Sequence, residues 1–183
     1  MKKPILPIVT IICIILLGSC NEQSKTEVEI GKAINKQLTI ELFDSVTYKD
    51  KRISFADFRM QFRFISIVFL QEGCAPCYPK FVEWHKKMES IDVPDNYTTL
   101  FVINAKSYKH FLAGSGGSEL IDNKYYHVID PEGMFLIRNS NIPRWIIDRT
   151  LLIDSTTRIK LIGVPFATED MKKLFHSITD VTQ

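Results

Sequence analysis

Two runs of almost continuous apolar residues, 64–70 and 100–103, stand near the middle of the chain. Such runs predict strands that are covered on both faces of a sheet. Between them, apolar residues at spacings of three, four and three predict the buried face of a helix from about Cys74 to Ser90; they are Phe81, Trp84, Met88 and Ile91. Strand, helix and strand in succession predict a βαβ unit with parallel strands and a right-handed crossover.

The rest of the pattern predicts further elements of one domain. Apolar and polar residues alternate over Leu38–Phe43, which predicts a half-exposed strand. The apolar and aromatic residues of Tyr125–Ile129 predict a third core strand. Thr150–Ile153 and Arg158–Ile162 are separated by a short polar segment, which predicts a hairpin. Helices are predicted at Ser54–Phe62, at Ser107–Ala113, after the turn Asp130–Gly133, and from Thr168 or Glu169 onward.

The N-terminal end has the layout of an export signal. Lys2 and Lys3 precede an apolar run that is shorter than the roughly 20 residues of a membrane-spanning helix. The run ends in Leu17-Gly18-Ser19-Cys20, which resembles a bacterial lipobox and implies cleavage before Cys20 and a lipid on its thiol. We predict a signal peptide over 1–19, a lipidated and partly helical tether over 20–37, and one domain over 38–183. The alternatives are an ordinary signal peptide or an uncleaved anchor, in which Cys20 has no role.

Charge and cysteine count narrow the functional classes. Loss of Lys2 and Lys3 would bring the 23 Lys and Arg residues level with the 21 Asp and Glu residues. Balanced charge gives no basic footprint, so no nucleic-acid partner is predicted. Cys13 would leave with the signal peptide and Cys20 would carry lipid. Cys74 and Cys77 then remain as a pair in an exported compartment, where disulfides persist.

The segment Cys74-Ala75-Pro76-Cys77 fits three kinds of site. A zinc site needs about four ligands, and the chain offers no second cysteine pair, only scattered histidines. A structural disulfide would close a very short loop and would stabilise the fold little. A redox pair is favoured, because a helix that starts at Cys74 directly after a strand would stabilise its thiolate. Cys74 could then attack a disulfide of another molecule, and Cys77 could resolve the mixed disulfide.

The order of strand, CxxC helix, strand, helix, strand, hairpin and helix resembles the thioredoxin fold. The lipobox, the N-terminal strands and the turn Asp130–Gly133 are more similar to exported TlpA/ResA-type thiol-disulfide oxidoreductases. This resemblance covers about Leu38 to Ile178. It implies an α/β fold with three α/β/α layers, a central mixed sheet and an N-terminal strand extension. It also implies that Cys74 is the nucleophile and that Cys77 is the resolving cysteine. No cofactor or metal is predicted.

Some positions depart from the pattern of this family. Gly73 stands where thioredoxins have a tryptophan, and Val68 stands where they often have a buried acid. Pro143 is the candidate for the cis-proline that faces the cysteines in the family. Counting back from the strand at 150–154 instead puts Asp148 in that position, so either extra residues follow Pro143 or the cis-proline is absent.

For other side chains near the cysteines we expect ordinary roles in the core, on the surface or in a loop. Glu72 is either a general base or, as we prefer, a solvated loop charge. Without an acid at Val68, proton transfer to and from Cys77 would be slower or would run through water. On the predicted helix, Trp84 is expected in the core and His85 on the surface.

Together these observations predict a membrane-anchored thiol-disulfide oxidoreductase, of the protein-disulfide reductase type by resemblance. Its partners would be thiols and disulfides of exported proteins and an upstream membrane electron donor, and it would be anchored through Cys20. It would lie in the bacterial cell envelope, facing the periplasm or extracytoplasmic space. The alternatives are a redox-inactive thioredoxin-like binding module and a thiol peroxidase, although Ile67 and Gln71 replace the proline and threonine typical of peroxidases.

Overall fold

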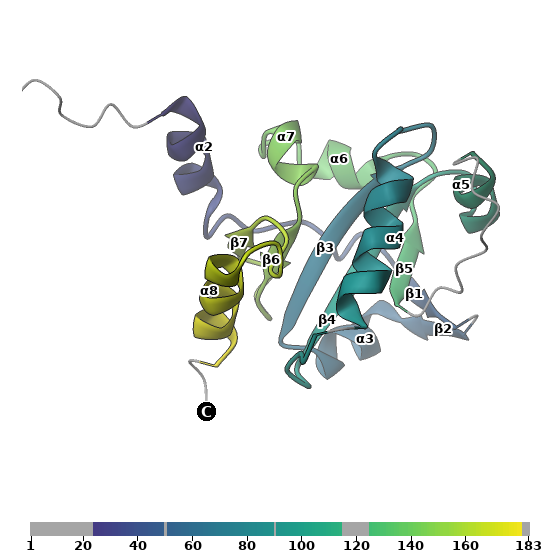
Figure 1. Ribbon diagram of the computed structural model, residues 1–183. Coiled ribbons are helices and arrows are strands. Elements are labelled where there is room, and N and C mark those ends of the chain that lie inside the picture. The colour runs from purple at the N-terminus through teal and green to yellow at the C-terminus, as the bar shows by residue number, and fades with distance from the viewer. Residues whose placement is uncertain (1–23, 50, 90, 115–124, 181–183) are drawn as a thin grey trace, which may run out of the picture.

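The computed structural model describes residues 24–49, 51–89, 91–114 and 125–180. The strands are β1 (Ser45–Tyr48), β2 (Lys51–Ser54), β3 (Phe64–Gln71), β4 (Tyr97–Asn104), β5 (Tyr126–Ile129), β6 (Leu151–Ile153) and β7 (Ile159–Ile162). The helices are α2 (Lys25–Ala33), α3 (Phe55–Gln61), α4 (Cys77–Met88), α5 (Tyr108–Gly114), α6 (Met134–Arg138), α7 (Arg144–Ile147) and α8 (Glu169–Thr179). The strands form one sheet in the order β2-β1-β5-β4-β3-β6-β7, with helices on both faces (Figure 1).

The centre of the sheet is parallel and both edges are antiparallel. β3 pairs with β4 from Phe64 opposite Tyr97 to Gln71 opposite Asn104, and β4 pairs in parallel with β5. Because α4 connects β3 to β4, the predicted βαβ unit is confirmed. β6 pairs antiparallel with β3 and with β7, so the predicted hairpin is confirmed as well.

Side chains of β3 alternate between two apolar clusters, one on each face of the sheet. Ile65, Ile67 and Phe69 belong to the first cluster, which α3, α6 and α7 cover with Phe58, Phe135 and Ile146. Phe64, Val68 and Leu70 belong to the second cluster, which α4 and α8 cover with Phe81, Trp84 and Phe175. Burial on both faces explains the continuous apolar run in the sequence. The predicted three-layer α/β/α architecture with a mixed sheet is confirmed.

The strand predicted at Leu38–Phe43 is not formed. Leu38 and Ile40 are fully buried in the first cluster, yet the nearest ladder contact is an isolated bridge between Gln37 and Arg158. The alternation in this segment therefore marks packing positions and not strand pairing. The N-terminal strand extension is instead the hairpin of β1 and β2, and β1 pairs antiparallel with β5.

Part of the predicted tether is docked on the domain. Ala33, at the end of α2, is fully buried, and the Trp145 indole N–H donates to Glu29 Oε2 at 2.7 Å. The Ile159 amide also donates to the Lys36 carbonyl at 3.0 Å, which ties this segment to β7. The predicted signal peptide and Cys20 lie outside the described residues. Within the described ranges, no helix combines the length and the apolar character needed to cross a membrane.

Candidate active site

The predicted redox pair lies in the turn between β3 and α4. The Cys74 amide donates to the Gln71 carbonyl at 3.3 Å, and the Cys77 amide donates to the Cys74 carbonyl at 3.0 Å. Gly73 has a φ of 73°, a left-handed conformation that glycine adopts without the penalty of a side chain. The glycine that replaces the family's tryptophan is therefore suited to this turn.

Helix α4 begins at Cys77 and not at Cys74, so the predicted start is wrong. Pro76 is the N-cap of α4, and the chain from Gly73 to Pro76 forms a turn ahead of the helix. Pro79 falls in the first helical turn, where backbone amides have no partner inside the helix, and it is tolerated there. Cys74 still lies directly in front of the helix, where the helix dipole favours negative charge.

Cys74 and Cys77 form a disulfide, with their Cα atoms 5.3 Å apart. Cys77 is only 8 % exposed, and its Sγ accepts a hydrogen bond from the Gln71 amide at 3.4 Å. Cys74 is half-buried and therefore the more accessible of the two. This unequal burial is what an attacking cysteine and a covered, resolving cysteine require.

The space under the disulfide is apolar. Val68 is fully buried in the same cluster as Cys77, together with Phe81 and Phe101. The position that often carries a buried acid in the family therefore contributes hydrocarbon to the core. Charging Cys77 in these surroundings is costly, because burial disfavours a thiolate.

Of the two burial predictions for the middle of α4, one is confirmed and one is wrong. Trp84 is 3 % exposed, so its predicted place in the core is confirmed. His85 is 5 % exposed, so its predicted place on the surface is wrong. Its Nδ1 lies 2.9 Å from the Phe81 carbonyl, and its ring stacks on Phe101 at a centroid distance of 5.5 Å. Aromatic neighbours and a local hydrogen bond thus explain why this imidazole is buried.

The predicted cis-proline is not formed. None of the peptide bonds between described residues is cis, and the bond before Pro143 is therefore trans. Pro143 caps the N-terminus of α7 and lines a groove with Leu136 and Ile147. α7 fills the interval between Pro143 and Asp148, which accounts for the extra residues in the spacing. The Asp148 carbonyl, at the end of this interval, accepts a hydrogen bond from Lys80 of the CxxC helix.

Arg144 connects Asp148 to the end of β3. Its Nε donates to Asp148 Oδ1 at 2.7 Å, and its Nη2 donates to Gln71 Oε1 at 3.0 Å. The guanidinium also lies over the Phe69 ring, 4.8 Å from the centroid. Because the Gln71 amide donates to Cys77 Sγ, a chain of polar contacts runs from Asp148 to the disulfide.

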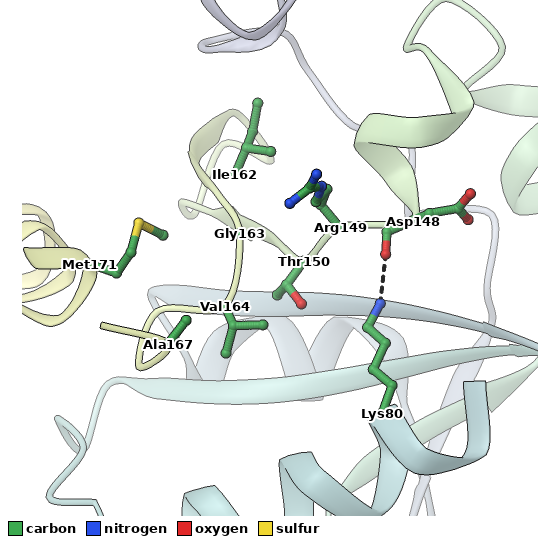
Figure 2. Close-up of a pocket in the computed structure, with 9 residues that line it drawn as sticks. All are labelled: Lys80, Asp148, Arg149, Thr150, Ile162, Gly163, Val164, Ala167 and Met171. Carbon is green, nitrogen blue, oxygen red and sulfur yellow. Dashed lines mark hydrogen bonds between the residues drawn. The ribbon is translucent and has the colours of Figure 1, made fainter. Parts of the chain in front are cut away.

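Figure 2 shows Lys80 reaching from α4 across a pocket of about 390 Å³ towards the segment that precedes β6. Its Nζ donates to the Asp148 carbonyl at 2.8 Å. Burial lowers the pKa of Lys80 to about 8, and the Asp148 charge opposes part of this effect. The opposite wall of the pocket is mostly apolar and includes Ile162, Val164 and Met171. The pocket therefore holds an amine that loses its proton at a lower pH than an ordinary lysine does.

Comparisons with known proteins give structural matches alone. No protein-family model matches the chain, and no curated protein matches it either. The C-terminal domain of a protein assigned as a thiol-disulfide oxidoreductase from Bacteroides thetaiotaomicron matches with a TM-score of 0.53 and 13% identity, over 81% of this chain and 97% of that one. A protein assigned as thiol:disulfide interchange protein DsbE from Chlorobium tepidum matches with a TM-score of 0.50 and 15% identity, over 79% and 94%. A protein assigned as an electron transfer protein from Aquifex aeolicus matches with a TM-score of 0.51 and 11% identity, over 78% and 96%.

The chain has a thioredoxin-like fold. The predicted resemblance is confirmed at the level of structure, since its neighbours include proteins assigned as thiol-disulfide oxidoreductases. At such low sequence identity the likeness concerns the fold, so the assignment of chemistry depends on the site itself. Among the described residues, no group of three or more His, Cys, Asp or Glu side chains could hold a metal ion.

Sequence reasoning did not single out two residues of this thioredoxin-like site. Lys80 follows Cys77 at a spacing that places side chains on one helix face, so a signal was present in the sequence. Arg144 had no such signal, because its contact with Gln71 joins residues 73 positions apart. Glu72 is exposed, and its Oε2 accepts the Lys106 amide at 3.4 Å, as suits the preferred expectation of a loop charge.

Proposed function

We propose that the protein is a membrane-anchored thiol-disulfide oxidoreductase that uses Cys74 as the nucleophile and Cys77 as the resolving cysteine. One observation carries the proposal: the Cys74–Cys77 disulfide stands between β3 and α4, and Cys74 is the more exposed of the two residues. The thioredoxin-like fold of the chain supports the same chemistry.

In the reductive direction, the Cys74 thiolate attacks one sulfur of a substrate disulfide. The substrate S–S bond breaks, its other sulfur leaves as a thiolate and takes up a proton, and a mixed disulfide with Cys74 remains. The Cys77 thiolate then attacks Cys74 Sγ. This step releases the second substrate thiol and restores the Cys74–Cys77 disulfide. An upstream membrane electron donor would reduce that disulfide for the next cycle.

The N-terminal sequence supports a place of action at a membrane. A lipid on Cys20 would hold the domain at the extracytoplasmic surface of a bacterial membrane, where exported proteins carry disulfides. The substrates would then be thiols and disulfides of exported proteins.

The full-length protein in detergent micelles tests the redox assignment. We expect the Cys74–Cys77 disulfide to equilibrate with dithiothreitol, and Cys74→Ser to abolish turnover of a disulfide substrate. Cys77→Ser should trap a mixed disulfide on Cys74. Alkylation followed peptide by peptide identifies Cys74 and Cys77 as the cysteines that react. If mild oxidants never join Cys74 to Cys77, the proposal is wrong.

The potential of the pair indicates its direction of use. A reduction potential of about −270 mV, as in thioredoxin, would support a reductant. A potential of about −120 mV, as in DsbA, would support an oxidant.

A redox-inactive binding module is the second candidate, and two observations favour it. Val68 provides no acid under the disulfide, and the peptide before Pro143 is trans. The cellular role of the double variant Cys74→Ser/Cys77→Ser distinguishes the two functions. Loss of the cellular role supports the oxidoreductase, whereas its full retention supports the binding module.

A further inference from the structure

Cys77 needs a proton acceptor that the core does not supply. To resolve a mixed disulfide, its thiol must become a thiolate, and burial makes that ionisation unfavourable. Cys77 is 8 % exposed, and Val68 beneath it is fully buried hydrocarbon. Glu72 is exposed and its carboxylate accepts the Lys106 amide, on the loop side of the pair. A side chain that accepts this proton in place of water would therefore come from the helix or from the segment that faces it.

Lys80 is placed to meet this need. It follows Cys77 by three residues on α4, and side chains at this spacing share one helix face with Cβ atoms about 5–6 Å apart. Its long side chain is half-buried and extends over the pocket towards Asp148 (Figure 2). The pocket gives the amine a route for exchanging its proton with solvent.

The groups around Lys80 make its ammonium more acidic than that of an ordinary lysine. Burial lowers its pKa to about 8, and the Asp148 charge raises it by a smaller amount. The carboxylate of Asp148 is already paired with Arg144, and Arg149 adds a second positive charge to the pocket wall. None of the pocket residues contributed by the segment from β7 to α8 has a charged side chain.

We propose that Lys80 accepts the proton of Cys77 when Cys77 resolves the mixed disulfide. The inference rests on the proposed function, because it assigns a role within that reaction. It also explains how the exchange can run without an acid at Val68: the titrating group lies one helical turn along α4 instead of under the disulfide.

The step balances in atoms and charge. The neutral Lys80 amine leaves the Asp148 carbonyl and takes the proton of the Cys77 thiol, which gives an ammonium and a thiolate. The thiolate attacks Cys74 Sγ, a new S–S bond forms, and the bond from Cys74 to the substrate sulfur breaks. The substrate leaves with the electron pair as a thiolate and takes the proton from Lys80. The amine is then neutral again, and two cysteine thiols have been oxidised while one substrate disulfide has been reduced over the full cycle.

Titration of the lysine side chains in the full-length protein tests the coupling directly. With carbon-13-labelled lysine, the Lys80 signal is assigned as the one that Lys80→Arg removes. We expect its midpoint at about 8 in the oxidised protein. The midpoint should move upward on reduction, and it should be lower in reduced Cys77→Ser than in the reduced unchanged protein, because a Cys77 thiolate stabilises the ammonium. Lys86, an exposed lysine of the same helix, should keep its midpoint in both states. Equal Lys80 midpoints in the two states would overturn the proposal.

A second experiment isolates the resolving step. Reduced protein is mixed with an aromatic disulfide, which gives a coloured thiolate product that needs no proton. The first thiolate is released when Cys74 attacks the reagent. The second is released when Cys77 resolves the mixed disulfide. We expect Lys80→Met to slow the second release by about 100-fold, the lower range for general-base catalysis. Lys80→Arg should slow it similarly near pH 7, because a guanidinium stays protonated and cannot act as a base.

The outcomes separate the proposals. Absence of the first release in the unchanged protein counts against the oxidoreductase itself. A normal first release with a second release that Lys80→Met leaves unchanged rejects only the role of Lys80. Wild-type rates in Lys80→Arg would show that a fixed charge suffices and would also reject it. Lys86→Met is the matched control and should change neither phase. If Lys80→Met does not fold, the titration of the unchanged protein decides the question.

Discussion

The two sides of the Cys74–Cys77 disulfide are built from different chemistry. The apolar side, under α4, contains Val68 and Phe81, both fully buried. The polar side, formed by Arg144, Asp148 and Lys80, is linked to the cysteines through Gln71, whose side chain accepts from Arg144 and whose amide donates to Cys77 Sγ. The Arg144 and Asp148 side chains are each 48% exposed. The apolar side therefore consists of buried hydrocarbon, whereas the polar side consists of charged groups that are in contact with water.

This difference separates two tasks that a buried acid would combine. An acid at position 68 would place proton transfer inside the core, where every change also affects folding. Here the core under the disulfide is hydrocarbon, and the titrating amine of Lys80 stands beside a pocket. We therefore expect substitutions on the apolar side to change stability most, and substitutions on the polar side to change protonation most.

Phe81→Ala should have the largest effect on stability. The Phe81 ring packs against Phe101 at a centroid distance of 5.0 Å and against Phe111 at 5.7 Å. Removing it leaves a cavity, so we expect the free energy of unfolding in denaturant to fall by about 3–5 kcal/mol. Leu174→Ala is the control, because Leu174 is 46% exposed on α8 and its loss should change stability by less than about 0.5 kcal/mol. Similar losses in both variants would contradict the assignment of the apolar side as the main source of stability.

The elements that form the apolar side could be predicted because their signals are local. The runs at 64–70 and 100–103 are long enough, and apolar enough, to exclude an exposed strand. The start of α4 was misplaced because the turn around Ala75 is fixed by hydrogen bonds to β3, which periodicity does not report. Leu38–Phe43 was misread for a related reason: alternating burial has the same pattern whether or not a partner strand lies alongside.

The polar side could not be predicted because its contacts cross the chain. The bond from Lys80 to the Asp148 carbonyl joins residues 68 positions apart, and the sequence contains no pattern for it. The cysteines were found because their spacing carries the chemistry on its own. Their partners were identified only in part: the family pattern favoured Pro143, which in the structure starts a short helix, whereas the count back from the strand at 150–154 gave Asp148.

Gly73→Ala should have the next largest effect, because Gly73 sets the turn that joins the two sides. Its φ of 73° costs about 1–2 kcal/mol for a residue with a side chain. No atom lies within 4 Å of the added Cβ, so the loss of stability is due to the backbone alone. Gly31→Ala on α2 also meets no atom within 4 Å, and should raise stability by about 0.4–1 kcal/mol. Changes of the same sign in both variants would mean that the conformation of Gly73 does not control this turn.

Lys80 should give the polar side a pH dependence of stability. Its pKa is about 8 in the folded protein and 10.5 in the reference state, so between these values the unfolded chain binds more protons. The free energy of unfolding should therefore rise with pH across this window and lose that contribution as pH falls through about 8. Denaturant unfolding at several pH values measures the slope. Lys80→Met should flatten it, and Lys86→Met should not; an equal slope in both variants would place the titrating group elsewhere.

Arg144→Met should have the smallest effect on stability and should still shift the protonation of Lys80. The exposed ion pair with Asp148 contributes less than about 1 kcal/mol, and the contact with the Phe69 ring adds a similar amount at most. Once Arg144 is gone, however, the Asp148 carboxylate is no longer neutralised. Its charge then stabilises the ammonium of Lys80, so the pKa of Lys80 should rise.

The lysine titration described above measures this shift, and Arg138→Met on α6 is the matched control. Arg138 is exposed in the helix before α7, so its loss removes the same charge without breaking the Asp148 pair. An upward shift in the Lys80 midpoint in Arg144→Met alone would show that the polar side tunes protonation through local charge pairing. Equal shifts in both variants would mean that Lys80 responds to the net charge of the domain. A loss of several kcal/mol in Arg144→Met would instead show that the polar side supports the fold, and the two sides of the disulfide would no longer have separate roles.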